Sequence, residues 1–407
     1  MSPGCAARCL WPESIFRSVA WLPLWFLLVP DFNGHAAGPV QWGQSVLVNS
    51  TPNFEDKGLD SRHIRPGRFG SQYGRMTKLE NGNWLIVYTL YDNNGYKFAE
   101  AHGLDWQGTA LQVAVSSDNC RTWKILSTLR DNNRDLDNGE IIQLPNGKLR
   151  LAARSVRWQE SYRIRVWSSD DTGLTWQSLS TVDSNEGTPG GLGNPDKGVY
   201  EPDFCFLDNG ALAIFYANEK HVTGNPSFSQ IVSEKISADG GSTWSEEIWA
   251  AWDPAKPSDR PGMPVVTKMG NGKYLAVFEV VGSHNAEIFC KTSADGKTWT
   301  NGIGTRVPGQ IGGPYVTTLK NGKLLVTSNT GNVSLSDDFG ATWYLNDPPA
   351  WGNGSIRVYW WLSVYEISPD EIGVVASVPR LSGGTDVRLK FGTLPPNASQ
   401  IQNPPTH

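Results

Sequence analysis

The chain has 407 residues, a formal net charge of -5 and only 18% charged residues. No basic patch stands out, so the composition argues against nucleic acid as a partner. With 43 Gly, 26 Pro and 18 Trp, the chain is rich in turn residues and in large aromatic anchors. This balance favours one large all-β domain with many strands, and Trp also suits stacking on sugar rings, although core packing is its commoner use.

The N-terminus has the pattern of a secretory signal peptide. Arg17 precedes an apolar run from Val19 to Pro30, and small residues follow it, so cleavage after Ala36 or Ala37 is expected. The apolar run is shorter than the roughly 20 residues that a membrane helix needs. We therefore expect residues 1–37 to be a signal peptide and residues 38–407 to form one catalytic domain that is secreted, monomeric and not bound to a membrane.

Export agrees with the N-x-S/T sequons and does not conflict with the cysteines. The sequons are at Asn49, Asn332, Asn353 and Asn397. Cys5 and Cys9 fall in the expected signal, so at most one disulfide can form among Cys120, Cys205 and Cys290. No Cys/His spacing indicates a metal site, and no cofactor is expected.

Five hairpin signals follow along the chain, each an Asn-Gly turn between alternating apolar residues. They lie at Asn81-Gly82, Asn146-Gly147, Asn209-Gly210, Asn271-Gly272 and Asn321-Gly322. A sixth copy replaces the turn by Pro369-Asp370. Asn-Gly flanked in this way is the strongest short-range signal of a β-hairpin.

A second phrase, S-x-D-x-G-x-T-W, follows each of the first five hairpins. It begins at Ser116, Ser169, Ser237, Ser293 and Ser336, and the copy at Ser293 is one residue shorter. Ser and Asp can bond the backbone of a turn, Gly tolerates a positive φ, and Trp anchors the strand that follows. The phrase resembles the Asp-box of sialidases and other β-propellers.

The two repeats together predict four strands per unit and six units, which is the pattern of a six-bladed β-propeller of antiparallel blades with Asp-box turns. The sixth unit lacks the phrase. Its third strand is expected over Asp386 to Leu394, and its outer strand near Ser45 to Ser50 at the other end of the chain. This pairing would close the ring and remove a free sheet edge.

A geometric argument places candidate site residues. In a hairpin, residues equally distant from the turn lie at the same end of the two strands, which here is the mouth of the central channel. The residues eight before and eight after the turn Asn should therefore ring the mouth: Tyr73, Asn138, Glu201, Met263 and Gly313 before it, and Thr89, Arg154, Ala217, Glu279 and Asn329 after it.

Two carboxylates in this ring, Glu201 and Glu279, lie on adjacent units. Glu279 stands among apolar residues, where a carboxylate destabilises the fold unless it is paired or functional. The alternative is a structural Glu paired with an arginine such as Arg154. Glu140 and Asp203 lie one pleat deeper on the same face, as a third acid, a modulator of pKa values or a ligand for hydroxyls.

Two carboxylates across one pocket suit glycoside hydrolysis, in which one protonates the leaving oxygen and the other attacks or activates water. A separation of about 5–5.5 Å would give retention and about 6.5–9.5 Å inversion. We assign Glu201 as general acid/base and Glu279 as nucleophile, which are the roles of a retaining enzyme, although the sequence does not fix their order.

The pattern resembles the sialidase superfamily, but a sialidase needs an arginine triad and a tyrosine nucleophile. Arg75, Arg154 and Arg380 do not occupy equivalent positions, which argues against an anionic sugar. YEPDF around Glu201 and VFEVVG around Glu279 are more similar to the exo-1,5-α-L-arabinanases of glycoside hydrolase family 93. That resemblance implies a six-bladed propeller that removes arabinobiose from the non-reducing end of arabinan, with Glu201 and Glu279 as its two glutamates.

Two long insertions should close the mouth into a blind pocket for a chain end. They cover residues 60–72 and 91–109. Aromatic rings would stack on arabinose and arginines would bind its hydroxyls; the expected contacts are Arg65, Arg68, Trp106, Tyr200, Tyr315, Tyr359 and Trp360. Two alternatives stay open: a sialidase-type exoglycosidase and a sugar-binding propeller without activity.

Overall fold

The computed structural model describes residues 40–51, 70–92, 108–187, 197–352, 360–381 and 383–394. The chain divides into residues 1–37 and residues 38–407, and every described residue belongs to the second unit. The expected signal peptide therefore lies outside the described part. Among the described residues, no helix is both long and apolar enough to cross a membrane.

The described residues form an all-β fold of antiparallel four-stranded sheets, which we number 1 to 6 in chain order. Sheet 1 contains β2 (Gly70–Lys78), β3 (Trp84–Tyr91), β4 (Ala110–Ser116) and β5 (Lys124–Leu129). Sheet 2 contains β6 (Asp135–Gln143), β7 (Leu149–Arg157), β8 (Ser161–Ser169) and β9 (Gln177–Glu186). Sheet 3 contains β10 (Val199–Phe206), β11 (Leu212–Asn218), β12 (Ile231–Ser237) and β13 (Ile248–Ala251), with the short 3-10 helix η1 (Lys220–Thr223) after β11.

The second half of the chain repeats this arrangement. Sheet 4 contains β14 (Arg260–Lys268), β15 (Tyr274–Val281), β16 (Glu287–Ser293) and β17 (Thr305–Ile311). Sheet 5 contains β18 (Tyr315–Thr318), β19 (Leu324–Thr327), β20 (Val333–Ser336) and β21 (Tyr344–Leu345). Sheet 6 contains β22 (Trp360–Ser368), β23 (Glu371–Pro379), β24 (Thr385–Thr393) and β1 (Gln41–Asn49), and a parallel bridge from Gly70 to Thr385 joins it to sheet 1.

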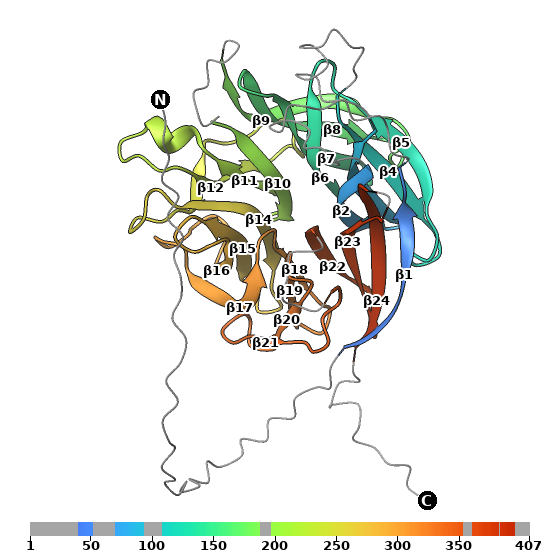
Figure 1. Cartoon of the computed structure of the whole chain (residues 1–407). Coiled ribbons are helices and arrows are strands. Elements are labelled where there is room, and N and C mark those ends of the chain that lie inside the picture. The colour runs from blue at the N-terminus through green and yellow to red at the C-terminus, as the bar shows by residue number, and fades with distance from the viewer. Residues whose placement is uncertain are drawn as a thin grey trace, which may run out of the picture. The chain divides into compact units, whose positions relative to one another are not determined.

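The first strands of the sheets meet around a common centre, as Figure 1 shows. Each first strand contacts the next one, in the order β2, β6, β10, β14, β18 and β22, and β22 contacts β2. Each sheet thus presents its first strand to the centre and its fourth strand to the outside. The chain is cut into similar units that share one closed ring of inner strands, which is the arrangement that the repeats predicted.

The hairpin turns sit where the Asn-Gly pairs predicted, but with a different geometry. In the first, Gly82 N donates to Leu79 O at 2.9 Å, so Asn81 and Gly82 are the third and fourth residues of the turn rather than its two central ones. Gly82 takes the positive φ, 86°, and Asn81 does not. Asn81 instead accepts a bond from Asn83 N at 3.0 Å. The other four Asn-Gly turns repeat this pattern, so Asn acts through its side chain and Gly through its backbone.

All five S-x-D-x-G-x-T-W phrases form similar Ser-Asp turns, and the copy at Ser293 closes over one residue fewer than the others. In the third copy, Ser237 Oγ donates to Asp239 Oδ1 at 2.7 Å and accepts from Gly241 N at 2.7 Å. Asp239 also accepts from Thr243 N and Thr243 Oγ1. Because these bonds stabilise the ionised carboxylate, the pKa of Asp239 falls to about 2. The ionised Asp therefore stabilises the turn by accepting its hydrogen bonds.

In three of the five phrases the closing Trp donates a hydrogen bond to the preceding sheet, whereas Trp123 Nε1 and Trp343 Nε1 have no hydrogen-bond partner among the described residues. Trp176 Nε1 donates to Ser127 Oγ at 3.1 Å, and Trp244 Nε1 donates to Ser180 Oγ at 3.0 Å. The equivalent acceptor for Trp299 is a carboxylate, Glu234 Oε2, at 2.9 Å. These bonds cross from one sheet to the next, so three of the apolar anchors predicted from sequence also join the sheets.

The two ends of the chain meet in sheet 6. β1 pairs antiparallel with β24, from Gln41 opposite Thr393 to Asn49 opposite Val387. Val40 N also donates to Asn346 Oδ1 at 2.7 Å. This pairing follows the sequence prediction, and it protects the edge of β24 that would otherwise be free.

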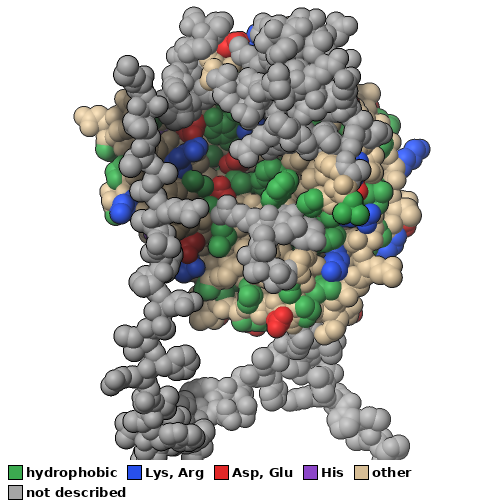
Figure 2. All heavy atoms as spheres, viewed as in Figure 1, with side chains coloured by type: hydrophobic (Ala, Val, Ile, Leu, Met, Phe, Trp, Pro, Cys, Tyr) green, Lys and Arg blue, Asp and Glu red, His purple; other side chains and the backbone are tan. Residues whose placement is uncertain are grey.

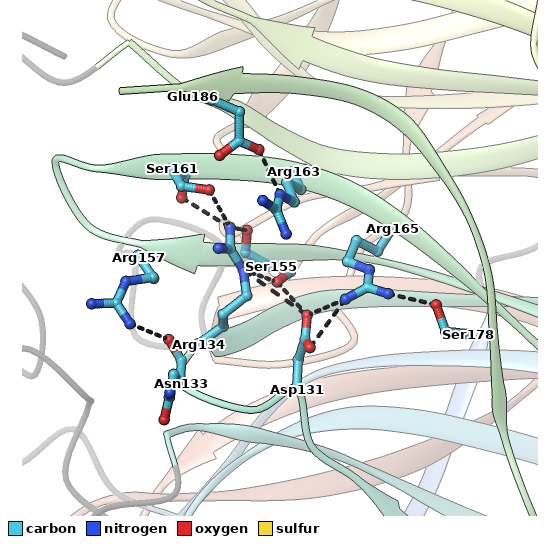
Figure 3. A network of polar contacts seen from close by, with 10 residues as sticks. All are labelled: Asp131, Asn133, Arg134, Ser155, Arg157, Ser161, Arg163, Arg165, Ser178 and Glu186. Atoms are coloured by element: carbon cyan, nitrogen blue, oxygen red, sulfur yellow. Dashed lines mark hydrogen bonds and ion pairs between the residues drawn. The ribbon is translucent and has the colours of Figure 1, made fainter. Parts of the chain in front are cut away.

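An arginine-rich network fixes the entry to sheet 2 (Figure 3). Asp131, before β6, accepts from Arg165 on β8 at 2.9 Å and from Ser155 on β7 at 2.7 Å. Arg134 donates to Ser155 and Ser161. Since β6 begins one residue after Arg134, the network sets the position of the strand that carries Asn138 and Glu140.

The structure shows the burial of the three cysteines and of one of the sequons. Cys120, Cys205 and Cys290 are all buried and free. Asn332 is 5% exposed and donates to Gly309 O at 3.3 Å, so this sequon is inaccessible in the folded chain. Asn49 lies on β1, whereas Asn353 and Asn397 fall outside the described residues.

The buried carboxyl group of Glu234 should make the free energy of unfolding depend on pH. Burial raises its pKa to about 8, and Oε1 has no hydrogen-bond partner among the described residues. The folded state holds a proton there that the unfolded state loses above about pH 4.5, so this group lowers the free energy of unfolding as pH rises from 4.5 to 8. Glu234→Gln keeps an acceptor for Trp299 and should raise the free energy of unfolding at pH 8 by about 1–3 kcal/mol.

Urea unfolding at pH 5 and at pH 8 checks this expectation. The variant and the parent should differ much less at pH 5 than at pH 8. Glu287, which is ion-paired and more exposed, is the matched control: its change to Gln should alter the free energy of unfolding by the same amount at both pH values. Equal stability of Glu234→Gln and the parent at both pH values would contradict the expectation.

Candidate active site

The first strands of five of the six sheets contain a β-bulge at the residue eight before the turn, and in sheet 5 the equivalent residue, Gly313, lies just ahead of β18. The positions eight before the turn all have a left-handed backbone, with φ of 58° at Tyr73, 55° at Asn138, 60° at Glu201, 50° at Met263, 52° at Gly313 and 53° at Trp361. Left-handed φ is rare for residues other than Gly, so its recurrence at equivalent positions is a regular feature of the repeat.

The bulge corrects the register that equal counting from the turn predicted. Thr89 lies opposite Gln72 rather than Tyr73, and Glu279 lies opposite Gly262 rather than Met263. The extra residue of the bulge causes the shift, because it is left unpaired while the strand continues. The two rings of expected residues are therefore offset by one position, although both still lie at the strand ends beyond the bulge.

The two candidate glutamates bind backbone amides of the following sheets. Glu201 Oε2, from β10, accepts from Met263 N on β14 at 2.9 Å. Glu279 Oε2, from β15, accepts from Gly313 N ahead of β18 at 2.8 Å. Each carboxylate thus has one oxygen fixed by a backbone amide of the next sheet, and both glutamates are only partly buried. This arrangement orients two carboxylates at neighbouring positions of the ring.

Gly262 lies beside both candidate glutamates. It stands directly opposite Glu279 in the β14–β15 pair, and a Cβ added to it would be 3.6 Å from Glu201 Oε2. The same Cβ would come within 2.4 Å of Gln230 Nε2. Glycine at this position thus leaves room for the Gln230 amide beside Glu201.

Electrostatics distinguish Glu201. Burial raises its pKa to about 7, and the neighbouring charge of Glu279 raises it further toward that value. Arg154, the Met263 amide and Arg260 act in the opposite direction. A carboxyl group that gives up its proton near pH 7 can act as an acid and then as a base at neutral pH.

Below the glutamates lies a buried charged cluster from the positions six before the turn. Arg75 Nε is 4.0 Å from Glu140 Oε2, and Asp203 Oδ2 accepts from Val266 N at 2.8 Å. Burial raises the pKa of Asp203 to about 7, while burial and the Asp203 charge hold the pKa of Glu140 well above its usual range. Two acids therefore face one arginine, so the cluster favours one proton on the acid pair at neutral pH.

Tyrosines surround this cluster. The Arg75 guanidinium lies 3.9 Å from the Tyr73 ring centre and 5.1 Å from that of Tyr315. The rings of Tyr315 and Tyr365 are 5.1 Å apart, and burial raises the pKa of Tyr365 to about 12. Arg75 Nη2 is buried and has no hydrogen-bond partner among the described residues.

The remaining predicted residues lie around the rim. Arg154 Nη2 pairs with Asp137 Oδ2 at 2.7 Å, so the recorded partner of this arginine is Asp137. Tyr200 donates its hydroxyl to Glu219 Oε2 at 3.0 Å. Trp360 is 37% exposed, and the ring position of sheet 6 is held by the next residue, Trp361.

Arg65, Arg68, Trp106 and Tyr359 lie outside the described residues. The three arginines considered for a sialidase triad each have protein partners: Arg75 binds Trp361 O, Arg154 binds Asp137 and Arg380 binds Thr51 O.

Sequence reasoning considered Arg75 only for an arginine triad and did not place it, or several other groups, at the centre. Arg75 and Tyr365 lie at the floor, and Glu219, Gln230 and Arg260 lie at the rim. Arg75 could have been found, because it lies six before its turn, as Glu140, Asp203 and Tyr315 do. The sequence also missed a group of possible metal ligands formed by Asp253, Asp259 and His284, in which Asp259 already binds Ser283.

The outer surface of this face agrees with that geometry. Figure 2 shows acidic side chains gathered among hydrophobic ones near the middle of the face, with basic side chains beside them. Asp137, Arg154 and Trp158 line a small niche, and the Arg154 guanidinium lies 5.2 Å from the Trp158 ring.

Solved structures share this propeller-type all-β fold. The α-L-arabinanase of Penicillium chrysogenum, complexed with arabinobiose, is 22% identical, covers 86% of this chain and 98% of its own, and has a TM-score of 0.67. The family 93 α-L-arabinofuranosidase of Fusarium graminearum, also with arabinobiose, is 20% identical, with coverages of 86% and 97% and a TM-score of 0.68. The NanB sialidase of Streptococcus pneumoniae is 13% identical, with coverages of 84% and 70% and a TM-score of 0.54.

No protein-family model matches the chain, and no curated protein matches it in sequence. The resemblance to family 93 that the YEPDF and VFEVVG segments suggested is thus met at the level of structure, where solved glycoside hydrolases of that family have the same fold.

Proposed function

We propose that this chain is a secreted, exo-acting glycoside hydrolase of linear α-1,5-L-arabinan. In this proposal the six sheets are the blades of a six-bladed propeller, and the five Ser-Asp phrases are its Asp-boxes. One observation carries the activity: the carboxylates of Glu201 and Glu279, from adjacent sheets, are each fixed at the centre of the ring by a backbone amide of the next sheet, Met263 N and Gly313 N. The fold shared with solved arabinanases supports the substrate class.

The proposed mechanism divides the work between the two glutamates. Glu201, whose pKa is raised to about 7, protonates the glycosidic oxygen as the leaving sugar departs. Glu279 attacks the anomeric carbon, and the Gly313 amide keeps the second carboxylate oxygen in place. Water then enters, Glu201 takes its proton, and hydrolysis of the glycosyl-enzyme restores the anomeric configuration.

Arabinobiose released from the non-reducing end is the expected first product. The test is incubation of the folded protein with linear α-1,5-arabinan, followed by analysis of the early products and of their anomeric configuration by ¹H NMR. A disaccharide that accumulates from the start with retained configuration is the expected result. A ladder of oligomers, inverted product or an absence of cleavage would each overturn this proposal.

A sialidase-type activity is the second candidate, supported by the five Ser-Asp turns and the similarity to a sialidase fold. The pairing of Arg154 with Asp137 and of Arg380 with Thr51 O disfavours it, because a sugar carboxylate needs available arginines. Release of sialic acid from a fluorogenic sialoside would favour it over the arabinanase. A third candidate is a sugar-binding propeller, which predicts binding of arabino-oligosaccharides that Glu201→Gln and Glu279→Gln leave unchanged, with no turnover.

A further inference from the structure

We infer that Glu219 and Arg260 form a rim clamp that positions Glu201 for the proposed hydrolysis. The inference rests on the proposed function and adds two positioning residues to it. Neither residue is part of the repeated pattern. Glu219 follows β11 in sheet 3, and Arg260 is the first residue of β14 in sheet 4.

Glu219 gathers the strand end that carries Glu201. Its side chain is 6% exposed, and its Oε2 accepts from Gly198 N at 2.7 Å and from the Tyr200 hydroxyl at 3.0 Å. Glu219 N in turn donates to Gly198 O at 3.0 Å. These bonds hold two of the three residues before Glu201, Gly198 and Tyr200, to Glu219.

Arg260 fastens the neighbouring strand to the same carboxylate. Its Nη2 binds Glu219 Oε1 and also donates to Gln230 Oε1 at 2.8 Å. Gln230 Nε2 donates to Pro261 O at 2.8 Å, and this amide lies where a side chain on Gly262 would be. The segment 260–263 is therefore held from two sides.

The clamp joins the two partners of one hydrogen bond. Glu201 lies at the end of the segment that Glu219 holds, and Met263, whose amide binds Glu201, lies at the end of the segment that Arg260 and Gln230 hold. The charged and titratable groups that face Glu201 are Tyr73 from β2, Arg154 from β7, Arg260 from β14 and Glu279 from β15. Glu219 offsets the Arg260 charge at the rim, as Asp137 offsets that of Arg154.

Two substitutions separate this role from a merely structural one, because they move the pKa of Glu201 in opposite directions. Glu219→Gln leaves the Arg260 charge without its acid, so the pKa of Glu201 should fall. Arg260→Gln removes a positive charge, so the pKa should rise. Because 44% of the Arg260 side chain is exposed, solvent and salt screen the effect, and each shift should be about 0.3–1 pH unit.

The measurement is the pH profile of kcat/KM on arabinotriose, read at its basic limb, together with the Glu201 carboxyl pKa from ¹³C NMR. Glu287→Gln is the matched control, since Glu287 forms an ion pair with Arg306 on the same sheet at 2.7 Å. Opposite shifts for the two clamp variants and no shift for the control are expected. Folded variants whose Glu201 pKa matches that of the parent would overturn the inference.

The two readouts keep the failures apart. An inactive parent protein would reject the proposed function, while the NMR titration would still decide whether Glu219 and Arg260 control Glu201. An active parent whose variants lose rate without any pH shift would reject the clamp and leave the function standing.

Discussion

Glu201→Gln should lower kcat on linear α-1,5-arabinan by about 10²- to 10⁴-fold, which is the usual contribution of a general acid/base. The amide oxygen can still accept from Met263 N, so the fold should be unchanged. The defect should be much smaller for cleavage of an aryl arabinoside with a good leaving group, because such a group departs without protonation. Initial rates on both substrates, with circular dichroism as a check on folding, measure the effect.

Glu279→Gln should abolish turnover of both substrates to a similar degree, since a nucleophile is needed whatever the leaving group. This contrast assigns the two roles. Greater rescue of Glu279→Gln than of Glu201→Gln by the activated substrate would reverse them. Glu287→Gln, a change of the same kind away from the pair, should retain parental rates, and losses under about tenfold in both glutamate variants would reject the pair as catalytic.

Removal of β1 should have the largest effect on stability. A chain that starts at residue 51 loses the pairing with β24, the bond from Val40 N to Asn346 and that from Trp42 Nε1 to Pro348 O. Each lost hydrogen bond costs about 0.5–1.5 kcal/mol and each large buried side chain about 1.5–3 kcal/mol. The sum is comparable with the whole net stability of a domain, so the shortened chain should unfold or aggregate at 37 °C.

A chain that starts at residue 38 is the control, because it keeps β1 whole. Thermal unfolding followed by circular dichroism should give it the same Tm as the longer chain. If the chain that starts at residue 51 kept a Tm within a few degrees of the control, β1 would be dispensable and the closure of the ring would rest on the other sheets.

The sequence predicted the architecture because repetition and turn chemistry are local. Asn-Gly and Ser-Asp phrases mark turns wherever they occur, and their order fixed the strand count and the pairing of the chain ends. It also brought Glu201 and Glu279 to the same end of adjacent sheets, and Glu140 and Asp203 to the layer below.

The rest could not be predicted for physical reasons. The bulge at residues such as Tyr73 and Met263 is a backbone conformation that the alternation of apolar residues does not encode, so the register was wrong by one position beyond it. The contact between Glu219 and Arg260 joins two residues 41 positions apart outside the repeat. Only the packing of two sheets reveals it.

The left-handed positions at the centre also affect which substitutions can raise the thermal stability of this fold. Five of the six residues at these positions carry side chains although their backbone is left-handed, a conformation that costs of order 1–3 kcal/mol for a residue other than glycine. Replacing Tyr73 or Met263 by Gly would relieve that strain but empty the centre of the ring. Tyr73 and Met263 are each only 5% exposed, so the loss of their packing should cost about 2–5 kcal/mol, more than the strain relieved, and heat-resistant variants should keep both side chains.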